Sequence, residues 1–251
     1  MFRPLAAPVA VVLAAVAVLA AAGCGNPPAD AGGRLTVFAA ASLTESFTSL
    51  GEEFEAANRG IRVTFNFGAS SALAQQIDQG APADVFASAN PANLERVAVA
   101  GEPRVFARNV LQIAVPKGNP AGVTGLADLG RPELRIALCA EQAPCGAAAL
   151  TALRAAGVSA APDTLERDVK AALTKVALGE VDAALVYRTD VKAAAGTVDG
   201  IDFPEAAQAV NDYPIATLAD AGNATLAAAF VDFVLSPAGQ DTLAAAGFQR
   251  P

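Results

Sequence analysis

The sequence predicts an α/β fold built from short buried strands that alternate with longer helices. Short runs rich in Val, Ile and Phe alternate with Ala- and Leu-rich segments of helical spacing. The strand-like runs lack a polar face, which is typical of parallel sheets covered by helices on both sides. The chain has 251 residues, a length that suits two small lobes or one large domain.

The expected elements follow in chain order. β-branched and aromatic residues predict strands at 35–38, 61–67 and 84–87, each followed by an Ala/Leu segment that predicts a helix at 43–57, 72–78 and 91–100. The same patterns predict strands at 110–115, 134–138 and 183–187 and helices at 146–156 and 169–178. A strand at 213–218 precedes two terminal helices. Ser236 is the expected N-cap of the second helix and Pro237 its first residue.

The N-terminal segment has the features of a secretion signal. Arg3 precedes a short apolar run, 5–20, and small residues follow as far as Gly23. This run is too short for a usual membrane-spanning helix, although a transmembrane anchor is the alternative interpretation. We therefore expect residues 1–23 to be a signal peptide.

Cys24 follows small residues, as the lipid-bearing cysteine of bacterial lipoproteins does, although Ala21 stands where Leu is more common. Residues 24–33 are rich in Pro and Gly and predict a flexible tether. We expect lipid attachment at Cys24, a folded part that begins near Arg34, and an extracytoplasmic protein anchored to the cell membrane.

The acidic balance of the chain excludes some partners. The formal net charge is −8, so nucleic acid and anionic lipid surfaces are not expected partners. Any anion site must therefore rely on local donors. Nothing in the sequence indicates an oligomer, and we expect a monomer.

The other two cysteines, Cys139 and Cys145, form an isolated pair outside the cytosol. A disulfide is the natural state of such a pair. The competing interpretation is a soft-metal site, but two thiols in a chain without histidine cannot complete a usual zinc shell. We therefore expect a Cys139–Cys145 disulfide and no direct metal ligands.

Small and hydroxyl residues occupy several junctions between a strand and a helix. Ser42 follows the first strand, and Ser70 and Ser71 follow the second. In an open α/β sheet these junctions meet at the carboxyl edge, where ligands bind and helix N-termini favour anions. The alternative is that these serines only cap helices, since Ser42 and Glu45 have the spacing of a capping box.

Three further candidates lie in the second half of the chain. Cys145 precedes a predicted helix, and Val169 follows Asp168, a plausible N-cap. Tyr187 ends a strand, where a tyrosine can bury its ring and keep its hydroxyl free to donate. Taken alone, Val169 also fits an ordinary apolar residue of a first helical turn.

Enzyme functions are poorly supported. Without histidine or an expected free thiol, the usual general base and most nucleophilic dyads are missing. A secreted hydrolase with Ser42 or Ser70 as nucleophile is an alternative, but it lacks a base. We expect no catalytic residues and no cofactor.

Five motifs follow one another along the chain: LTVFAAASLT at 35–44, FGASSALA at 67–74, GAPADVF at 80–86, DVKAAL at 168–173 and ALVY at 184–187. In this order they resemble the molybdate-binding proteins of bacterial ABC importers. The resemblance spans Leu35 to Phe248.

The resemblance implies a set of oxyanion donors. Ser42 and Ser70 would donate through hydroxyl and backbone N–H, Cys145 and Val169 through backbone N–H, and Tyr187 through its hydroxyl. Cys145 departs from the family, which more often has Ala there. A backbone donor tolerates that change.

The resemblance also implies the two-lobed periplasmic-binding-protein fold of type II, with mostly parallel sheets flanked by helices and the ligand in the interlobe cleft. Residues 34–114 and 214–251 would form lobe 1, and 115–213 lobe 2, with crossings near Val115 and Tyr213. The partner would be an ABC transporter permease.

Neutral donors suit a fully deprotonated tetrahedral dianion such as molybdate, tungstate or sulfate. Phosphate carries protons and would require an acceptor in the site. The expected ligand is molybdate or tungstate. The alternatives are a sulfate-binding protein of the same fold and an anion sensor that feeds no importer.

Overall fold

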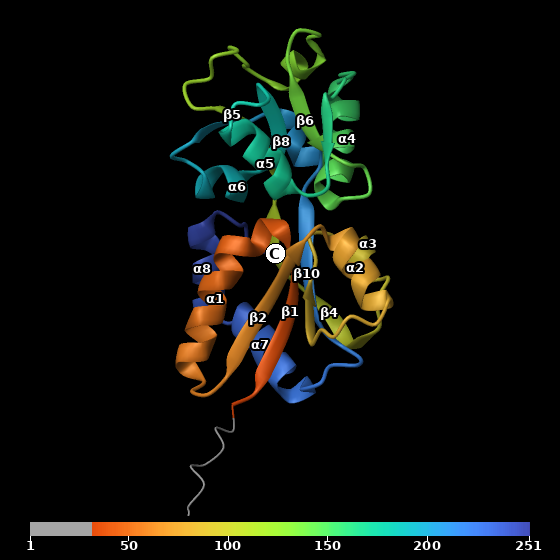
Figure 1. The fold of residues 1–251 in the computed structure, drawn as a ribbon, viewed down its shortest axis with the longest axis vertical. Coiled ribbons are helices and arrows are strands. Elements are labelled where there is room, and N and C mark those ends of the chain that lie inside the picture. The colour runs from red at the N-terminus through yellow and green to blue at the C-terminus, as the bar shows by residue number, and fades with distance from the viewer. Residues whose placement is uncertain (1–31) are drawn as a thin grey trace, which may run out of the picture. The chain divides into compact units, whose positions relative to one another are not determined.

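Two five-stranded sheets flanked by helices make up the described part of the chain, residues 32–251 of the computed structural model (Figure 1). The first sheet has the order β2-β1-β3-β10-β4. Its strands are β1 (Arg34–Ala40), β2 (Arg62–Gly68), β3 (Val85–Ala87), β4 (Val99–Asn109) and β10 (Asn211–Leu218). The predicted signal peptide, the predicted lipid-attachment residue Cys24 and most of the predicted tether lie outside the described residues.

The second sheet has the order β7-β6-β8-β5-β9. Its strands are β5 (Leu111–Pro116), β6 (Ile136–Cys139), β7 (Thr164–Glu166), β8 (Ala183–Tyr187) and β9 (Val198–Ile201). We call the first sheet and its helices, residues 34–109 and 211–251, the first lobe, and residues 110–210 the second lobe.

Helices cover the sheets of both lobes (Figure 1). Those of the first lobe are α1 (Thr44–Ala57), α2 (Ser70–Asp78), α3 (Pro91–Leu94), α7 (Ala224–Leu235) and α8 (Pro237–Ala246). Those of the second lobe are α4 (Pro144–Ala156), α5 (Val169–Ala177) and α6 (Arg188–Ala193). Three short 3-10 segments complete the set: η1 (Ala41–Leu43), η2 (Leu126–Gly130) and η3 (Pro204–Gln208).

Both sheets are mixed, so they contain more antiparallel pairing than the sequence predicted. In the first lobe β1 pairs in parallel with β2 and β3, whereas β10 is antiparallel to β3 and β4. In the second lobe β6 is parallel to β7 and β8, whereas β5 is antiparallel to β8 and β9. The antiparallel strands β4, β5 and β10 flank the two places where the chain changes lobes.

The chain enters the second lobe at Val110, between β4 and β5, whereas the sequence placed this crossing near Val115. The run 111–115 is a strand as expected, but it pairs with β8 and β9. Its apolar pattern indicates a buried strand in either lobe, so the pattern alone could not assign the partner sheet. The return crossing lies between β9 and β10.

The helix predicted over 91–100 is wrong. The helix α3 ends at Leu94, and Val99 already begins β4. Gly101 has a φ of +83°, which interrupts any helix, and the long strand pairs with β10. The prediction also missed β7, α6 and β9, which are only three to six residues long.

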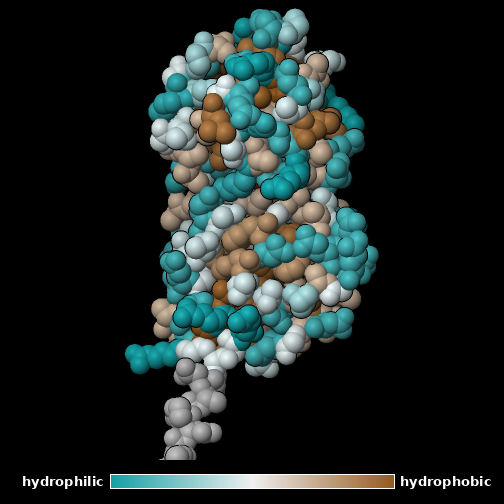
Figure 2. All heavy atoms as spheres, in the orientation of Figure 1, coloured by the Kyte–Doolittle hydropathy of each residue, from teal (hydrophilic) through white to brown (hydrophobic). Residues whose placement is uncertain are grey.

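Each lobe has its own core. In the first lobe, α1, β2, β4 and α7 contribute an edge-packed group of aromatic rings that includes Phe47, Phe65, Phe106 and Phe230. The second lobe is filled instead by Ala, Val and Leu side chains. The surface drawn in Figure 2 is a mosaic of hydrophilic and hydrophobic side chains. None of the helices in residues 32–251 is long and apolar enough to span a bilayer.

Candidate functional site

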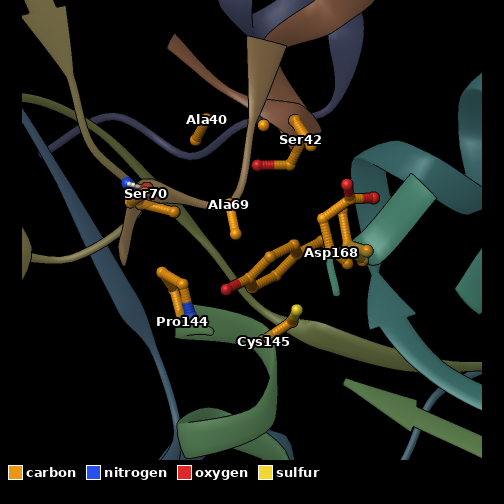
Figure 3. Close-up of a pocket in the computed structure, with 12 residues that line it drawn as sticks. Ala40, Ser42, Ala69, Ser70, Pro144, Cys145 and Asp168 are labelled. Carbon is orange, nitrogen blue, oxygen red and sulfur yellow. Dashed lines mark hydrogen bonds between the residues drawn. The ribbon is translucent and has the colours of Figure 1, made fainter. Parts of the chain in front are cut away.

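A small cavity lies between the carboxyl edges of the two sheets. Its volume of about 10 Å³ is roughly what a single water molecule requires, so the lining residues lie close together around it. Residues from η1, α2, α4 and α5 face this space (Figure 3). The lining residues are Ala40, Ala41, Ser42, Gly68, Ala69, Ser70, Ala89, Pro144, Cys145, Asp168, Val169 and Tyr187.

All five predicted donors lie around this one cavity, two from the first lobe and three from the second. Parallel pairing of β1 with β2 places Ala40 beside Gly68, so the segments that carry Ser42 and Ser70 leave the sheet side by side. In the second lobe, Tyr187 ends β8, while Cys145 and Val169 lie in the first turns of α4 and α5.

Ser42 does not cap α1. It lies within η1, and the N-cap position of α1 is occupied by Leu43, without a side-chain cap. The Ser42 hydroxyl lies instead 2.8 Å from the Tyr213 hydroxyl. The capping-box alternative is therefore wrong, because the 3-10 turn moves the start of α1 beyond Ser42.

Ser70 is the first residue of α2 and is fully buried. Its hydroxyl oxygen accepts a hydrogen bond from the backbone N–H of Ala89 at 2.9 Å, and the helix has no side-chain cap. The hydroxyl hydrogen remains available to a ligand, since the oxygen acts as acceptor in this bond.

Cys145 follows Pro144 in the first turn of α4, and a disulfide joins it to Cys139 at the end of β6. Gly146 lies against this strand end, because a Cβ at this position would clash with the carbonyl oxygen of Ala140. The bond and the close approach hold the start of α4 against β6. First-turn N–H groups have no partner within their helix, so the Cys145 amide is available to the cavity.

Asp168 is the N-cap of α5, as predicted. Its Oδ1 accepts from the backbone N–H of Ala171 at 2.9 Å, and its Oδ2 lies 3.4 Å from Nε of Arg167. Both carboxylate oxygens are therefore engaged within the protein. Val169, the first helical residue, is buried and its backbone N–H belongs to the unpaired first turn.

Tyr187 is 1% exposed, and its hydroxyl has no hydrogen-bond partner among residues 32–251. Burial raises the pKa of this phenol well above its ordinary value, and the neighbouring Tyr213 and Asp190 raise it further. The group is therefore a neutral donor at physiological pH. An unpaired buried hydroxyl is costly, and this one lines the cavity.

An ion-pair network lies beside the cavity. Lys170 of α5 contacts Asp190 of α6 at 3.0 Å and Glu45 of α1 at 2.7 Å, so it joins the two lobes. Burial raises the pKa of Asp190 to about 6, although Lys170 opposes the shift. Burial also lowers the pKa of Lys170, but Asp190 and Glu45 outweigh it and the net shift is upward. Asp190 in turn accepts from the backbone N–H of Tyr187 at 3.1 Å.

The cavity combines donors with an absence of positive side chains. Three helices, α2, α4 and α5, begin at it, and their N-termini favour an anion. Neither Lys nor Arg lines it within the described part of the chain, and residues 32–251 contain no group of acidic or cysteine side chains suited to a metal ion. The arrangement can hold an anion that only accepts hydrogen bonds.

Two features of the site were not predicted from the sequence. Tyr213 was recognised only as the start of a strand, although it is one of two tyrosines in the chain and both lie in strands that lead to the cavity. The Lys170–Glu45 contact joins residues far apart in sequence, so no local pattern could indicate it.

Residues 35–249 match the family of bacterial extracellular solute-binding proteins. The molybdate-binding protein ModA of Mycobacterium tuberculosis (strain H37Rv) is 42% identical over 246 residues, which cover 94% of each chain. The similarity therefore extends over both lobes.

Solved structures show the same fold. The periplasmic molybdate-binding protein of Azotobacter vinelandii has a TM-score of 0.74 at 22% identity, covering 86% of this chain and 99% of that one. The sulfate-binding protein SubI of Mycobacterium tuberculosis H37Rv has a TM-score of 0.76 at 19% identity, covering 87% of each chain. These two likenesses define the two-lobed architecture and leave the ligand open.

Proposed function

The chain belongs to the molybdate-binding family of bacterial extracellular solute-binding proteins, and from this membership we propose that it captures molybdate or tungstate and delivers it to the permease of an ABC importer. Members of this family are transport components, and the chain is not an enzyme. The proposal goes further than family membership in naming the ligands and the five residues that bind them.

The Tyr187 hydroxyl is the observation that carries the proposal. It is buried, lines the cavity and has no partner among the described residues. Asp168 is the one carboxylate that lines the cavity among the described residues, and both its oxygens are engaged within the protein. A ligand that satisfies this hydroxyl must therefore bring acceptor atoms of its own.

The five donors together can account for tight binding without a cationic side chain. The proposed donors are the hydroxyls of Ser42, Ser70 and Tyr187 and the backbone N–H groups of Ser42, Ser70, Cys145 and Val169, and all five residues line one small space. A hydrogen bond to a charged group contributes about 1.5–3 kcal/mol, and sub-micromolar binding needs about 8 kcal/mol. Several such bonds to one dianion are therefore sufficient.

The same donor set disfavours phosphate. Hydrogen phosphate would place its own O–H against protein donors, which leaves a buried donor unpaired. Sulfate is different, because it is a fully deprotonated tetrahedral dianion like molybdate. Sulfate binding is the second candidate function, and the neutral donors of the cavity fit it equally well.

We also propose that the ligand favours the closed arrangement of the lobes. Ser42 and Ser70 belong to the first lobe, whereas Cys145, Val169 and Tyr187 belong to the second. A ligand that bonds to both sets binds the closed form more strongly, and this difference shifts a hinge equilibrium. The chain crossings at 110 and between β9 and β10 are the proposed hinge.

For the N-terminal segment we propose cleavage after Gly23 and lipid attachment at Cys24, which would hold the protein at the outer side of the cell membrane. Metabolic labelling with a radioactive fatty acid tests this. Label should enter the wild-type protein and be absent from Cys24→Ala. Label retained in the variant would contradict the assignment.

The ligand is tested by thermal unfolding of the purified protein with molybdate, tungstate, sulfate or phosphate. At a hundredfold excess over Kd, binding adds about 2.7 kcal/mol, which raises Tm by roughly 5–10 °C for a chain of this size. We expect this shift with molybdate and tungstate. A larger shift with sulfate would move the assignment to the sulfate candidate, and no shift with any oxyanion would overturn the site.

A further inference from the structure

Tyr213 is a fully buried tyrosine whose hydroxyl reaches a proposed ligand donor. It lies in β10 of the first lobe, and its hydroxyl is 2.8 Å from the Ser42 hydroxyl. Its ring packs edge-on against Phe106, Tyr187 and Phe248. The ring is therefore held on several sides, so the position of its hydroxyl is fixed.

The direction of the Ser42–Tyr213 hydrogen bond follows from the acidity of the two hydroxyls. A phenol, with an ordinary pKa near 10, is a stronger acid than an aliphatic alcohol and is the better donor. Tyr213 also needs an acceptor, since a buried O–H without one is costly, and Ser42 Oγ provides it. The 2.8 Å distance itself allows either hydroxyl to donate. From these two arguments we assign the hydrogen to Tyr213, which leaves the Ser42 hydrogen for the cavity.

The geometry points to Tyr213 as a positioning residue that makes Ser42 an obligatory donor and thereby selects against oxyanions that carry a proton. This inference rests on the proposed function of the cavity. Figure 3 shows the Ser42 side chain directed toward the space between the lobes. With one lone pair occupied by Tyr213 and its hydrogen directed at the ligand, Ser42 turns its remaining lone pair away from that ligand.

The consequence for selectivity follows from hydrogen-bond accounting. Molybdate and sulfate only accept, so the fixed donor satisfies them both. Hydrogen phosphate must also donate, and it could be accommodated only if one hydroxyl in the cavity turned to accept. Without the Tyr213 hydroxyl, Ser42 can rotate about its Cβ–Oγ bond and accept from hydrogen phosphate. The protein would then still fold, but it would discriminate less between molybdate and phosphate.

The test is Tyr213→Phe, which removes one oxygen and keeps the ring. Affinities for molybdate, sulfate and phosphate are measured by calorimetric titration or competition at pH 8. We expect the phosphate-to-molybdate Kd ratio to fall about tenfold or more, the value of one hydrogen bond, while the sulfate-to-molybdate ratio stays within about twofold. Sulfate is the control ligand for phosphate, because it is also a tetrahedral oxyanion but carries no proton.

Phe248→Leu is the matched control variant. Phe248 packs on Tyr213 with ring centroids 5.4 Å apart but contributes nothing to the hydrogen bond. A purely structural role of Tyr213 predicts that both variants change all three affinities alike. We expect the control to leave both Kd ratios at their wild-type values.

A second measurement does not depend on the folding of Tyr213→Phe. The chain has only two tyrosines, so labelling with 3-fluorotyrosine gives two fluorine signals, which Tyr187→Phe assigns. Ser42→Ala should shift the Tyr213 signal and leave that of Tyr187 nearly unchanged.

The outcomes are distinct. Wild-type protein that binds none of the three oxyanions overturns the proposed function, and the inference with it. Wild-type protein that binds molybdate, together with an unchanged phosphate ratio or undetectable phosphate binding in Tyr213→Phe, overturns the inference alone. An unmoved Tyr213 fluorine signal in Ser42→Ala overturns it as well.

Discussion

The two lobes present their donors to the cavity in different ways. In the first lobe the proposed side-chain donors are serine hydroxyls, and each is already bonded to another protein group, Ser42 to Tyr213 and Ser70 to Ala89. In the second lobe two donors are backbone amides at helix starts, and the third, the Tyr187 hydroxyl, has no partner among residues 32–251. Ligand binding therefore completes an existing network on one side and supplies a missing partner on the other.

This difference predicts which substitutions change the affinity for the ligand without changing the free energy of unfolding of the free protein. A backbone amide persists through any side-chain change that keeps the helix start in place. A paired hydroxyl supports both the fold and the ligand, whereas an unpaired buried hydroxyl costs stability until the ligand arrives. Side-chain variants in the two lobes should therefore have different signatures.

Tyr187→Phe should have the largest effect on affinity. The hydroxyl is unpaired in the free protein, so the ligand gains a full charge-assisted bond, and its loss should raise the molybdate Kd about 100-fold. The free energy of unfolding without ligand should stay constant or rise slightly, because an unsatisfied buried group is removed. Calorimetric titration and urea unfolding measure the two quantities. A destabilised variant would show that the hydroxyl has a protein partner in solution.

Ser70→Ala should lower both the affinity for molybdate and the stability of the free protein. The ligand loses one donor, which should raise Kd about tenfold, and the buried N–H of Ala89 loses its acceptor, which should cost about 1–2 kcal/mol of stability. Ser71→Ala is the matched control, since Ser71 is adjacent and does not line the cavity. Equal effects of the two substitutions would contradict the role of Ser70.

Removal of the disulfide tests the tolerance of the backbone donors. Cys139→Ala combined with Cys145→Ala frees the short loop between β6 and α4. In the chain-entropy model this costs on the order of 2 kcal/mol of stability, while the Cys145 amide still begins a helix. We expect the molybdate Kd to change less than about fivefold. A loss as large as that of Tyr187→Phe would show that the disulfide, rather than the helix start, positions this donor.

The proposed donors all lie at junctions between a strand and a helix or at a strand end, and these places can be recognised in the sequence. Ser42, Ser70, Cys145, Val169 and Tyr187 could be selected because strand ends meet at one edge of a sheet, and the resemblance to a family narrowed the choice. Their placement around one cavity is consistent with that reasoning.

What the sequence could not supply are contacts between distant segments. The sequence spacing of Ser42 and Glu45 follows a valid local rule for a capping box. In the structure, however, Ser42 lies in a 3-10 turn before the helix. Its hydroxyl bonds instead to Tyr213, 171 residues away. The long strand β4 was missed because its partner β10 lies about a hundred residues further along the chain. Local propensity cannot register such a partner.

The Lys170–Glu45 contact gives the smallest expected effect. Lys170 of the second lobe contacts Glu45 of the first at 2.7 Å, but the Glu45 side chain is 54% exposed. Exposed ion pairs contribute about 0–1 kcal/mol, so Glu45→Gln should raise the molybdate Kd by at most about fivefold, by favouring the open arrangement of the lobes. The effect should diminish at high salt, since screening weakens the pair in the wild-type protein.

Glu52→Gln on the same helix is the matched control for that substitution. Glu52 is exposed and makes no ion pair among residues 32–251, so it removes the same charge without touching the other lobe. We expect no change in Kd from this variant at either salt concentration. If the two variants behave alike, net charge rather than the interlobe contact governs the small effect, and closure then depends on the donors around the ligand alone.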